Sequence, residues 1–184
     1  MIFKETRVKG AFMIEMEKRG DDRGFFARVF CRKEFEAQGI DIKVLQANIG
    51  FSQSRCTLRG LHYQVPPYAE AKLVRCTAGA LYDVILDLRP ASPTFKQWLG
   101  VELTDKNHTM LYVPEGCAHG YLTLAENTEI YYMVTQFYSP DAERGVRWND
   151  PAFDIKWPLT KGIVISDKDR SWPDWLEQKT NGQM

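Results

Sequence analysis

The chain has 184 residues, of which 44% are hydrophobic, 12% aromatic and 26% charged, and its formal net charge at pH 7 is zero. This length is sufficient for one domain with a continuous core, and the balanced charge excludes bulk electrostatic attraction to nucleic acid or to an anionic membrane. No apolar run is long enough to span a membrane, and the N-terminal residues lack the hydrophobic stretch of a signal peptide. We therefore expect a cytoplasmic protein with no nucleic-acid or membrane partner.

The cysteines agree with that location. The four of them, Cys31, Cys56, Cys76 and Cys117, are irregularly spaced and contain no C-x-x-C pair. This pattern predicts reduced thiols rather than disulfides or a zinc site.

In chain order, the first predicted element is a short helix over residues 32–38, ended by Gly39, which suits a helix C-terminus. Short runs rich in Val, Ile, Leu and Tyr follow, broken by Gly, Pro and Asn, and they cover residues 73–77, 81–88, 98–103, 110–113, 120–124 and 129–138. Residues 125–127 predict a hairpin turn between the last two runs, and helical turns are expected within residues 166–175.

The rhythm of these runs is typical of antiparallel sandwiches and barrels. Within residues 81–88, Asp83, Ile85 and Asp87 share one predicted strand face, and the apolar residues between them share the other. We expect one all-β domain over residues 1–184 with a few short helices, and a polar, frayed tail after about residue 177.

His62 lies in the segment LRGLHYQ, residues 58–64, and Lys72 follows it by ten residues. Among strands that carry several cations, His62 can transfer protons for an anionic substrate; the alternative is a structural histidine. Strict alternation puts Arg59 and His62 on opposite strand faces, but Gly60 between them permits a bulge that re-aims one of them.

A second motif, PEGCAHG, occupies residues 114–120. Its P-x-G-x-x-H pattern resembles the second motif of the cupins, whose first motif normally supplies two histidines as H-x-H. Here that first motif reads His62-Tyr63-Gln64, so one usual ligand is absent. A bound transition metal needs at least three good ligands, so we predict a cupin-like pocket with no metal and no cofactor.

Two further segments leave alternatives open. Tyr132 and Tyr138 share a face if residues 131–138 form one strand, and they are either part of an aromatic core or a proton donor and a stacking ring in a polar pocket. The acidic residues of Ser166 to Arg170 either orient His62 or belong to a solvated charged surface.

Taken together, these segments resemble the dTDP-4-dehydrorhamnose 3,5-epimerase family. The likeness is carried by DDRGFF at 21–26, LRGLHYQ at 58–64, KLVR at 72–75, SPTF at 92–95, VPEGCAHG at 113–120, ERGVRWNDP at 143–151 and SDKDR at 166–170.

The resemblance implies a cupin-like jelly roll that epimerises a nucleotide-linked 4-keto-6-deoxyhexose at C3 and C5, as in the synthesis of dTDP-4-dehydro-L-rhamnose. In the family's pattern, His62 is the base, Asp169 holds its imidazole, Tyr132 is the opposite-face acid and Lys72 stabilises the enolate oxygen. Substrate-binding positions fall on Arg23, Gln46, Asn48, Arg59, His119, Tyr138, Glu143 and Lys168, with Tyr138 stacking on the base. The resemblance also implies a homodimer paired through N-terminal strands.

The chain departs from the family's familiar pattern in two places. Residues 46–52 are more apolar than the usual QDNHS-like stretch, and Arg28 stands where well-known members carry a glutamate. These changes leave the nucleotide and the exact sugar open. Alternatives are an epimerase that acts at C3 or C5 only, one that uses a CDP- or GDP-linked sugar, and a sugar- or metal-binding cupin without catalysis.

Overall fold

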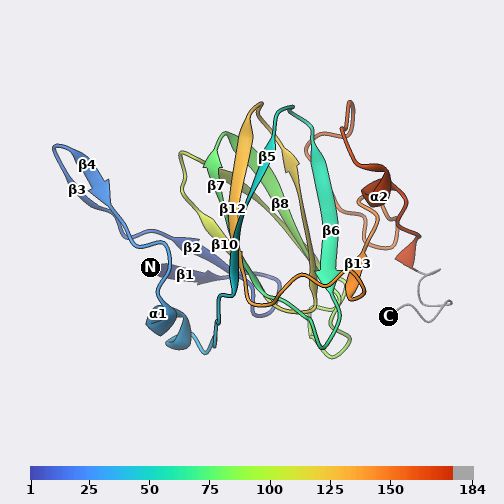
Figure 1. Ribbon diagram of the computed structural model, residues 1–184, viewed down its shortest axis with the longest axis horizontal. Helices are drawn as coiled ribbons and strands as arrows, with labels where there is room; N and C mark the ends of the chain where they lie inside the picture. Colours follow the sequence, from blue (N-terminus) through green and yellow to red (C-terminus); the bar gives the residue numbers. More distant parts are fainter. Residues whose placement is uncertain (176–184) are drawn as a thin grey trace.

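The computed structural model describes residues 1–175, so the predicted polar tail after residue 177 lies outside the described residues. Within residues 1–175 the chain forms two facing antiparallel sheets, a small hairpin and two short helices at the periphery (Figure 1). The elements are β1 (Ile2–Glu5), β2 (Phe12–Glu15), β3 (Arg19–Asp21), β4 (Gly24–Phe26), α1 (Arg32–Glu36), β5 (Gln46–Ser52), β6 (Leu58–Gln64), β7 (Lys72–Ala78), β8 (Ala80–Asp87), β9 (Trp98–Thr104), β10 (Met110–Val113), β11 (Cys117–Thr123), β12 (Thr128–Val134), β13 (Glu143–Gly145) and α2 (Asp167–Arg170).

One sheet has the strand order β1-β2-β10-β7-β12-β5, and the other has the order β13-β6-β11-β8-β9. The inward-facing side chains of both sheets form one core, which includes Val74, Cys76, Leu81, Ile85, Leu103, Leu111 and Ile130. Burying a Leu or Ile of this kind stabilises the fold by roughly 1.5–3 kcal/mol. The predicted all-β class is confirmed, and the fold is a cupin-like jelly roll.

The outer faces of the two sheets are covered by different parts of the chain. The segment after β13 packs Phe153, Trp157 and Trp175 onto the five-stranded sheet. On the six-stranded sheet, α1 buries Phe35 against Tyr112 of β10, with ring centroids 5.8 Å apart. These covers leave one outer apolar area exposed at the edge strand β5, because Ile49 is 64% and Phe51 53% exposed.

The hairpin of β3 and β4 projects from the body of the molecule beyond β1 and β2 (Figure 1). It carries exposed aromatic side chains, with Phe25 49% and Phe26 69% exposed. Phe25 contacts the ring of His108 edge-on, at 5.4 Å between centroids, and the Lys18 ammonium lies over the Phe25 ring at 4.7 Å. Two-stranded hairpins are marginally stable alone, so this hairpin is a candidate for packing against another surface.

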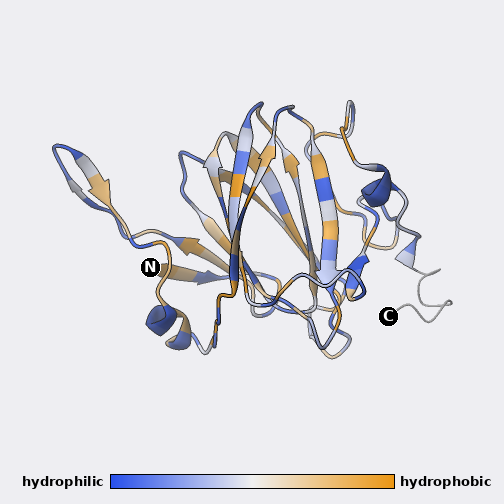
Figure 2. Ribbon diagram, in the orientation of Figure 1, coloured by the Kyte–Doolittle hydropathy of each residue, from blue (hydrophilic) through white to orange (hydrophobic). Residues whose placement is uncertain are grey.

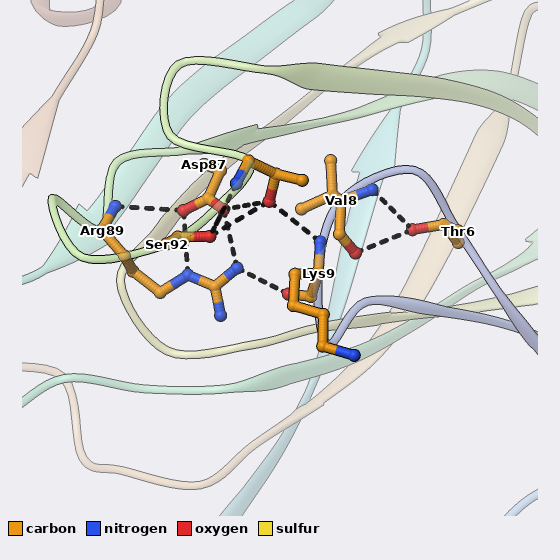
Figure 3. Close-up of polar contacts among 7 residues, drawn as sticks. Thr6, Val8, Lys9, Asp87, Arg89 and Ser92 are labelled. Carbon is orange, nitrogen blue, oxygen red and sulfur yellow. Dashed lines mark hydrogen bonds and ion pairs between the residues drawn. The ribbon is translucent and has the colours of Figure 1, made fainter.

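A buried carboxylate ties the β1–β2 turn to the loop after β8 (Figure 3). Asp87 is fully buried and accepts hydrogen bonds from Arg89 Nε at 2.8 Å, Ser92 Oγ at 2.6 Å and Thr94 Oγ1 at 2.7 Å. Arg89 in turn donates to the carbonyl of Lys9 at 2.6 Å. Burial raises the pKa of Asp87, but these hydrogen bonds outweigh it and hold the pKa at about 2.

Most predicted strands are confirmed with shifts of a few residues at their ends, and the alternation in 81–88 holds, although both faces of β8 are buried. The predicted hairpin at 125–127 is wrong. A turn is present, with Asn127 at φ +51°, but β11 belongs to the five-stranded sheet and β12 to the six-stranded one. Turn residues determine only that the chain reverses direction. Which strand each flanking segment pairs with depends on how all the strands are arranged in the two sheets.

The last predicted strand is also too long, because β12 ends at Val134 rather than at Tyr138. Val134 faces Gln46, the first residue of β5, and Lys72, the first residue of β7. Past this point one further bond, from Thr135 N–H to the Ala71 carbonyl at 3.1 Å, joins the chain to its neighbour, and Tyr138 lies in the following loop.

The helix predictions hold in shortened form. The helix expected at 32–38 spans Arg32–Glu36, and Gly39 has φ +76°, as a helix-ending glycine requires. The turns expected at 166–175 include α2, where Ser166 Oγ accepts a hydrogen bond from Asp169 N. All four cysteines are free, as predicted. No helix in residues 1–175 has the length and apolar character that crossing a membrane requires.

Candidate active site

Strand β6, along which hydrophobic and hydrophilic residues interchange (Figure 2), carries one extra residue where it pairs with β11. His62 pairs with His119 and Arg59 pairs with Tyr121, so the interval on β6 is one residue longer than the interval on β11. Gly60 occupies the bulge at φ +104°, and a Cβ there would lie 2.6 Å from the His119 carbonyl oxygen. The bulge that Gly60 permits is therefore present, and Arg59 and His62 line the same cavity.

His62 is bound to a carboxylate that arrives from α2. Its Nε2 lies 2.6 Å from Asp169 Oδ1, and the freed N–H of Gly60 donates to Asp169 Oδ2 at 3.1 Å. Because an ionised carboxylate only accepts, Nε2 carries the proton and the lone pair on Nδ1 is left as a base. Burial raises the pKa of Asp169, but the hydrogen bond and charge of His62, with the N–H of Gly60, outweigh it and lower the net pKa.

A second histidine–carboxylate pair lies beside the first. His119, directly opposite His62 in the β6–β11 ladder, places Nε2 2.7 Å from Asp83 Oδ1. Asp83 is fully buried on β8, and burial raises its pKa against the lowering effect of His119. The two pairs therefore differ, since burial prevails at Asp83 and the partner histidine prevails at Asp169.

The six-stranded sheet supplies the groups that face these histidines. Lys72, the first residue of β7, forms an ion pair with Glu70, and both side chains are close to nine-tenths buried. Tyr132 comes from the neighbouring strand β12 and lines the same cavity as Lys72. Burial raises the pKa of Tyr132 and the charge of Glu70 raises it further, so the phenol keeps its proton at neutral pH.

A hydrogen-bonded set of polar side chains, centred on Glu143, forms a further part of the site. Glu143 of β13 accepts a hydrogen bond from Tyr138 Oη at 2.7 Å and pairs with Lys168 Nζ at 2.6 Å. Burial raises the pKa of Glu143, but its bonds to Lys168 and Tyr138 outweigh this and lower the net value. The hydrogen bond to Glu143 raises the pKa of both Tyr138 and Lys168. Tyr138 nevertheless leaves its ring 60% exposed.

These side chains surround two adjoining cavities of about 420 and 280 Å³, which share His62, Lys72 and Tyr132. The larger cavity is also lined by Arg59, His119, Lys168 and Asp169, and the smaller one by Gln46, Asn48, Glu70, Tyr138 and Glu143. All four predicted catalytic residues thus lie together, with seven of the eight predicted substrate-binding residues.

The edge strand β5 and Arg59 define one wall. Gln46 and Asn48 alternate along β5 with residues of its exposed outer face, which turns their side chains toward the cavity. Arg59 is held against this strand, since its Nη2 donates to the Phe51 carbonyl at 2.9 Å and its Nε to Ser52 Oγ at 3.3 Å.

Arg23 is the predicted site residue that the single chain does not bring to these cavities. It lies on the projecting hairpin and bonds to Asp21, with Nη2 2.6 Å from Oδ2. Arg28 likewise pairs with Glu34 at the base of the hairpin, 3.0 Å away. The binding role of Arg23 therefore stays a prediction that the isolated chain cannot fulfil.

Sequence reasoning missed two carboxylates of the site. Asp83 sits in a clean strand alternation, where an acid between apolar residues signals a buried partner, and His119 is that partner. Glu70 follows a proline-rich turn, where acidic side chains are usually solvated. Its spacing of two from Lys72 was the available signal, because alternate residues of an extended chain project to the same side.

Within residues 1–175, no cluster of three or more His, Cys, Asp or Glu side chains is arranged to hold a metal ion. Whether the protein needs a metal is a separate question, and the metal-free site stays a prediction. What the site contains is a carboxylate-held histidine on one sheet and a protonated phenol and an ammonium group on the other. Such an array can move protons and stabilise a developing anion.

Residues 5–177 match the family described as dTDP-4-dehydrorhamnose 3,5-epimerase. The curated dTDP-4-dehydrorhamnose 3,5-epimerase of Sinorhizobium fredii is 44% identical over 177 residues, which cover 96% of this chain and 91% of the relative. The chain therefore belongs to the dTDP-4-dehydrorhamnose 3,5-epimerase family, whose members are isomerases.

Two solved structures are similar over nearly the whole chain. The dTDP-4-dehydrorhamnose 3,5-epimerase of Bacillus anthracis, crystallised with TDP and PPi bound, is 45% identical with a TM-score of 0.89, covering 94% of this chain and 99% of that one. ChmJ, a 3'-monoepimerase from Streptomyces bikiniensis in complex with dTDP-quinovose, is 32% identical with a TM-score of 0.89, covering 97% and 90%.

Proposed function

We propose that this enzyme epimerises dTDP-4-dehydro-6-deoxyglucose at C3 and C5, giving dTDP-4-dehydro-L-rhamnose. The observation that carries the proposal is the placement of His62 and Tyr132 on opposite sheets, facing one cavity that also holds Lys72. Inversion of a carbon requires removal of a proton from one face and its return to the other. Family membership, with 44% identity to the Sinorhizobium fredii enzyme, supports the same substrate.

The chemistry follows from the C4 carbonyl, which acidifies the hydrogens on C3 and C5. Nδ1 of His62 removes one of them, and the resulting imidazolium is stabilised by Asp169, 2.6 Å away. Negative charge moves to the carbonyl oxygen, where the ammonium of Lys72 stabilises the enolate more strongly than the neutral ketone. Tyr132 then donates its phenolic proton to the opposite face of the carbon. Solvent takes the proton from the His62 imidazolium and returns one to the Tyr132 phenolate, after which the second carbon reacts in the same way.

The smaller cavity is the proposed nucleotide end. The exposed ring of Tyr138 stacks on the base, while Arg59 and Lys168 bind the diphosphate. Four further residues complete the proposed substrate pocket, with His119 lining the larger cavity and Gln46, Asn48 and Glu143 lining the smaller one. Stacking tolerates any base, so the preference for thymidine depends on hydrogen bonds and shape near Arg28 and residues 47–51. Titration with dTDP, UDP, CDP and GDP tests this assignment, which tighter binding of GDP than of dTDP would refute.

Incubation with dTDP-4-keto-6-deoxyglucose in deuterated water tests the reaction itself. We expect deuterium at both C3 and C5 together with inversion at both. A second candidate, epimerisation at a single carbon, is favoured by the similarity to the Streptomyces bikiniensis 3'-monoepimerase. Exchange at one carbon only selects that candidate, and absence of exchange selects another substrate or a sugar-binding cupin.

We also propose that the protein is a cytoplasmic homodimer and that each chain forms a single domain. We further propose that its activity needs no metal or organic cofactor. The exposed Phe25 and Phe26 of the projecting hairpin and the exposed Ile49 and Phe51 of β5 are apolar surfaces that a second copy can cover. In this arrangement the hairpin of one chain carries Arg23 to the cavity of the other, where it binds the diphosphate. A monomer mass by light scattering at micromolar concentration excludes this arrangement.

A further inference from the structure

One carboxylate in the cavity has no part in the proton transfers described above. Glu70 lies between the turn after β6 and the first residue of β7, and it lines the smaller cavity. Its Oε1 pairs with Lys72 Nζ, and the exposed fractions of the two side chains are 12% and 11%. Because residues two apart in an extended chain project to the same side, the pair is built into the local backbone.

A buried ion pair is costly to desolvate and serves mainly to fix geometry. The long, flexible side chain of Lys72 is 11% exposed, and without Glu70 it would lack the ion-pair partner that holds its ammonium group. An ammonium group has three N–H donors, so one bond to Glu70 leaves two that can point into the cavity. Glu70 therefore restricts where Lys72 points without using up its capacity to bind an oxygen.

The same carboxylate acts on Tyr132. After burial, the charge of Glu70 is the next contribution that raises the pKa of the Tyr132 phenol. Glu70, Lys72 and Tyr132 thus form one group on the six-stranded sheet, opposite His62 on the other sheet.

We propose that Glu70 is a positioning residue, which through its ion pair holds the Lys72 ammonium where the carbonyl oxygen of the substrate becomes an enolate. This inference rests on the proposed function, because it assigns Glu70 a part in the same reaction. A donor fixed before the reaction begins stabilises the developing charge without reorganisation, and misplacing it by about 1 Å can cost about 100-fold in rate. The competing role for Glu70 is direct binding of a sugar hydroxyl.

A double-mutant cycle separates these roles. Glu70→Gln keeps the size of the side chain and removes its charge, and Glu126→Gln, in the exposed turn before β12, is the matched control. We expect Glu70→Gln to lower kcat about 10- to 100-fold with KM little changed, and Glu126→Gln to have no effect. In a Lys72→Ala background, Glu70→Gln should add less than about twofold, since the residue it positions is gone. The proposal is overturned if the rate losses of Glu70→Gln and Lys72→Ala multiply in the double variant. It is also overturned if Glu70→Gln raises KM and leaves kcat unchanged.

Two further measurements separate a positioning role for Glu70 from a merely structural one. The alkaline limb of the kcat profile should move to lower pH in Glu70→Gln, because Tyr132 loses a neighbouring negative charge; a purely structural residue leaves that limb in place. Crystal structures of both proteins should show Lys72 displaced in Glu70→Gln, and an unmoved Lys72 refutes the proposal even if the substrate is misassigned. Failure of the wild-type enzyme to turn over the dTDP-sugar would instead refute the proposed function.

Discussion

His62 and His119 are direct partners across β6 and β11, and each is bonded through Nε2 to a carboxylate of separate origin. Asp169 reaches His62 from α2, and Asp83 reaches His119 from the neighbouring strand β8. The two imidazoles thus have similar bonding, but only His62 is one-third exposed, with 33% of its side chain accessible against 10% for His119. This difference supports the proposal that His62 is the base and that His119 binds the substrate.

Replacing the two histidines separately tests that assignment. His62→Ala should lower both epimerisation and solvent exchange by about 10³-fold, because the base is removed. His119→Ala should mainly raise KM while exchange continues, which product analysis and deuterium incorporation measured on the same samples will show. Loss of exchange in His119→Ala with retention in His62→Ala would reverse the two roles.

Tyr132→Phe should block inversion more severely than exchange. Without the phenol, His62 can still remove a proton, exchange it with solvent and return it to the same face. The ratio of deuterium incorporated to product inverted, measured by NMR, should therefore rise above that of the wild type. An equal loss of both activities would show that Tyr132 is not the opposite-face acid.

Mixing two inactive variants tests whether Arg23 acts across the proposed dimer. We expect Arg23→Ala and His62→Ala each to be poorly active alone. If Arg23 serves the other chain, random mixed dimers contain one intact site, and an equimolar mixture should recover roughly a quarter of wild-type activity. Recovery should depend on time allowed for subunit exchange, and a mixture no more active than its components would place Arg23 outside the partner's site.

Chelation tests the prediction that activity needs no metal ion. Because Gln64 stands where the first cupin motif usually has its second histidine, we expect activity to survive exhaustive treatment with EDTA. Activity that disappears on chelation and returns with zinc, iron or manganese would show that a metal participates.

Asp87→Asn should destabilise the fold in a pH-dependent way. The pKa of Asp87 is about 2 in the folded protein, against an ordinary value of 3.8, so its charge stabilises the folded state above pH 4 by about 2 kcal/mol. That contribution declines as the pH falls from about 4 through 2 and is lost below 2, where the carboxylate is protonated in both states. Urea unfolding of wild type and Asp87→Asn should show their difference largest near neutral pH and shrinking in acid.

Much of this architecture could be predicted from local sequence, and the failures share a cause. The strand runs and the bulge at Gly60 are encoded in alternation and in one glycine, so neighbouring residues alone are enough to predict them. The end of β12 at Val134 depends on where β5 and β7 begin, which no pattern within residues 129–138 contains. The turn at Asn127 was visible, but not the sheet to which each flanking strand belongs.

The site shows the same division. Local chemistry and spacing were enough to indicate His62, Lys72 and the tyrosines as candidates. Asp169 is 107 residues from His62, and its role was assigned through the family's pattern. A role for Glu70 was not predicted, because an acidic residue after a proline-rich turn is usually exposed to solvent. Its significance lies in a burial that only packing reveals.

The bond between Asp169 and the bulged Gly60 joins strand β6 to a helix that follows all the strands in the chain. Every strand of both sheets leaves the ribosome before α2 does. Both sheets are therefore complete in the sequence before the carboxylate that holds the His62 imidazole, which lies 107 residues further along the chain than His62. In the proposed mechanism, the base on β6 depends on α2 packing back onto the bulge.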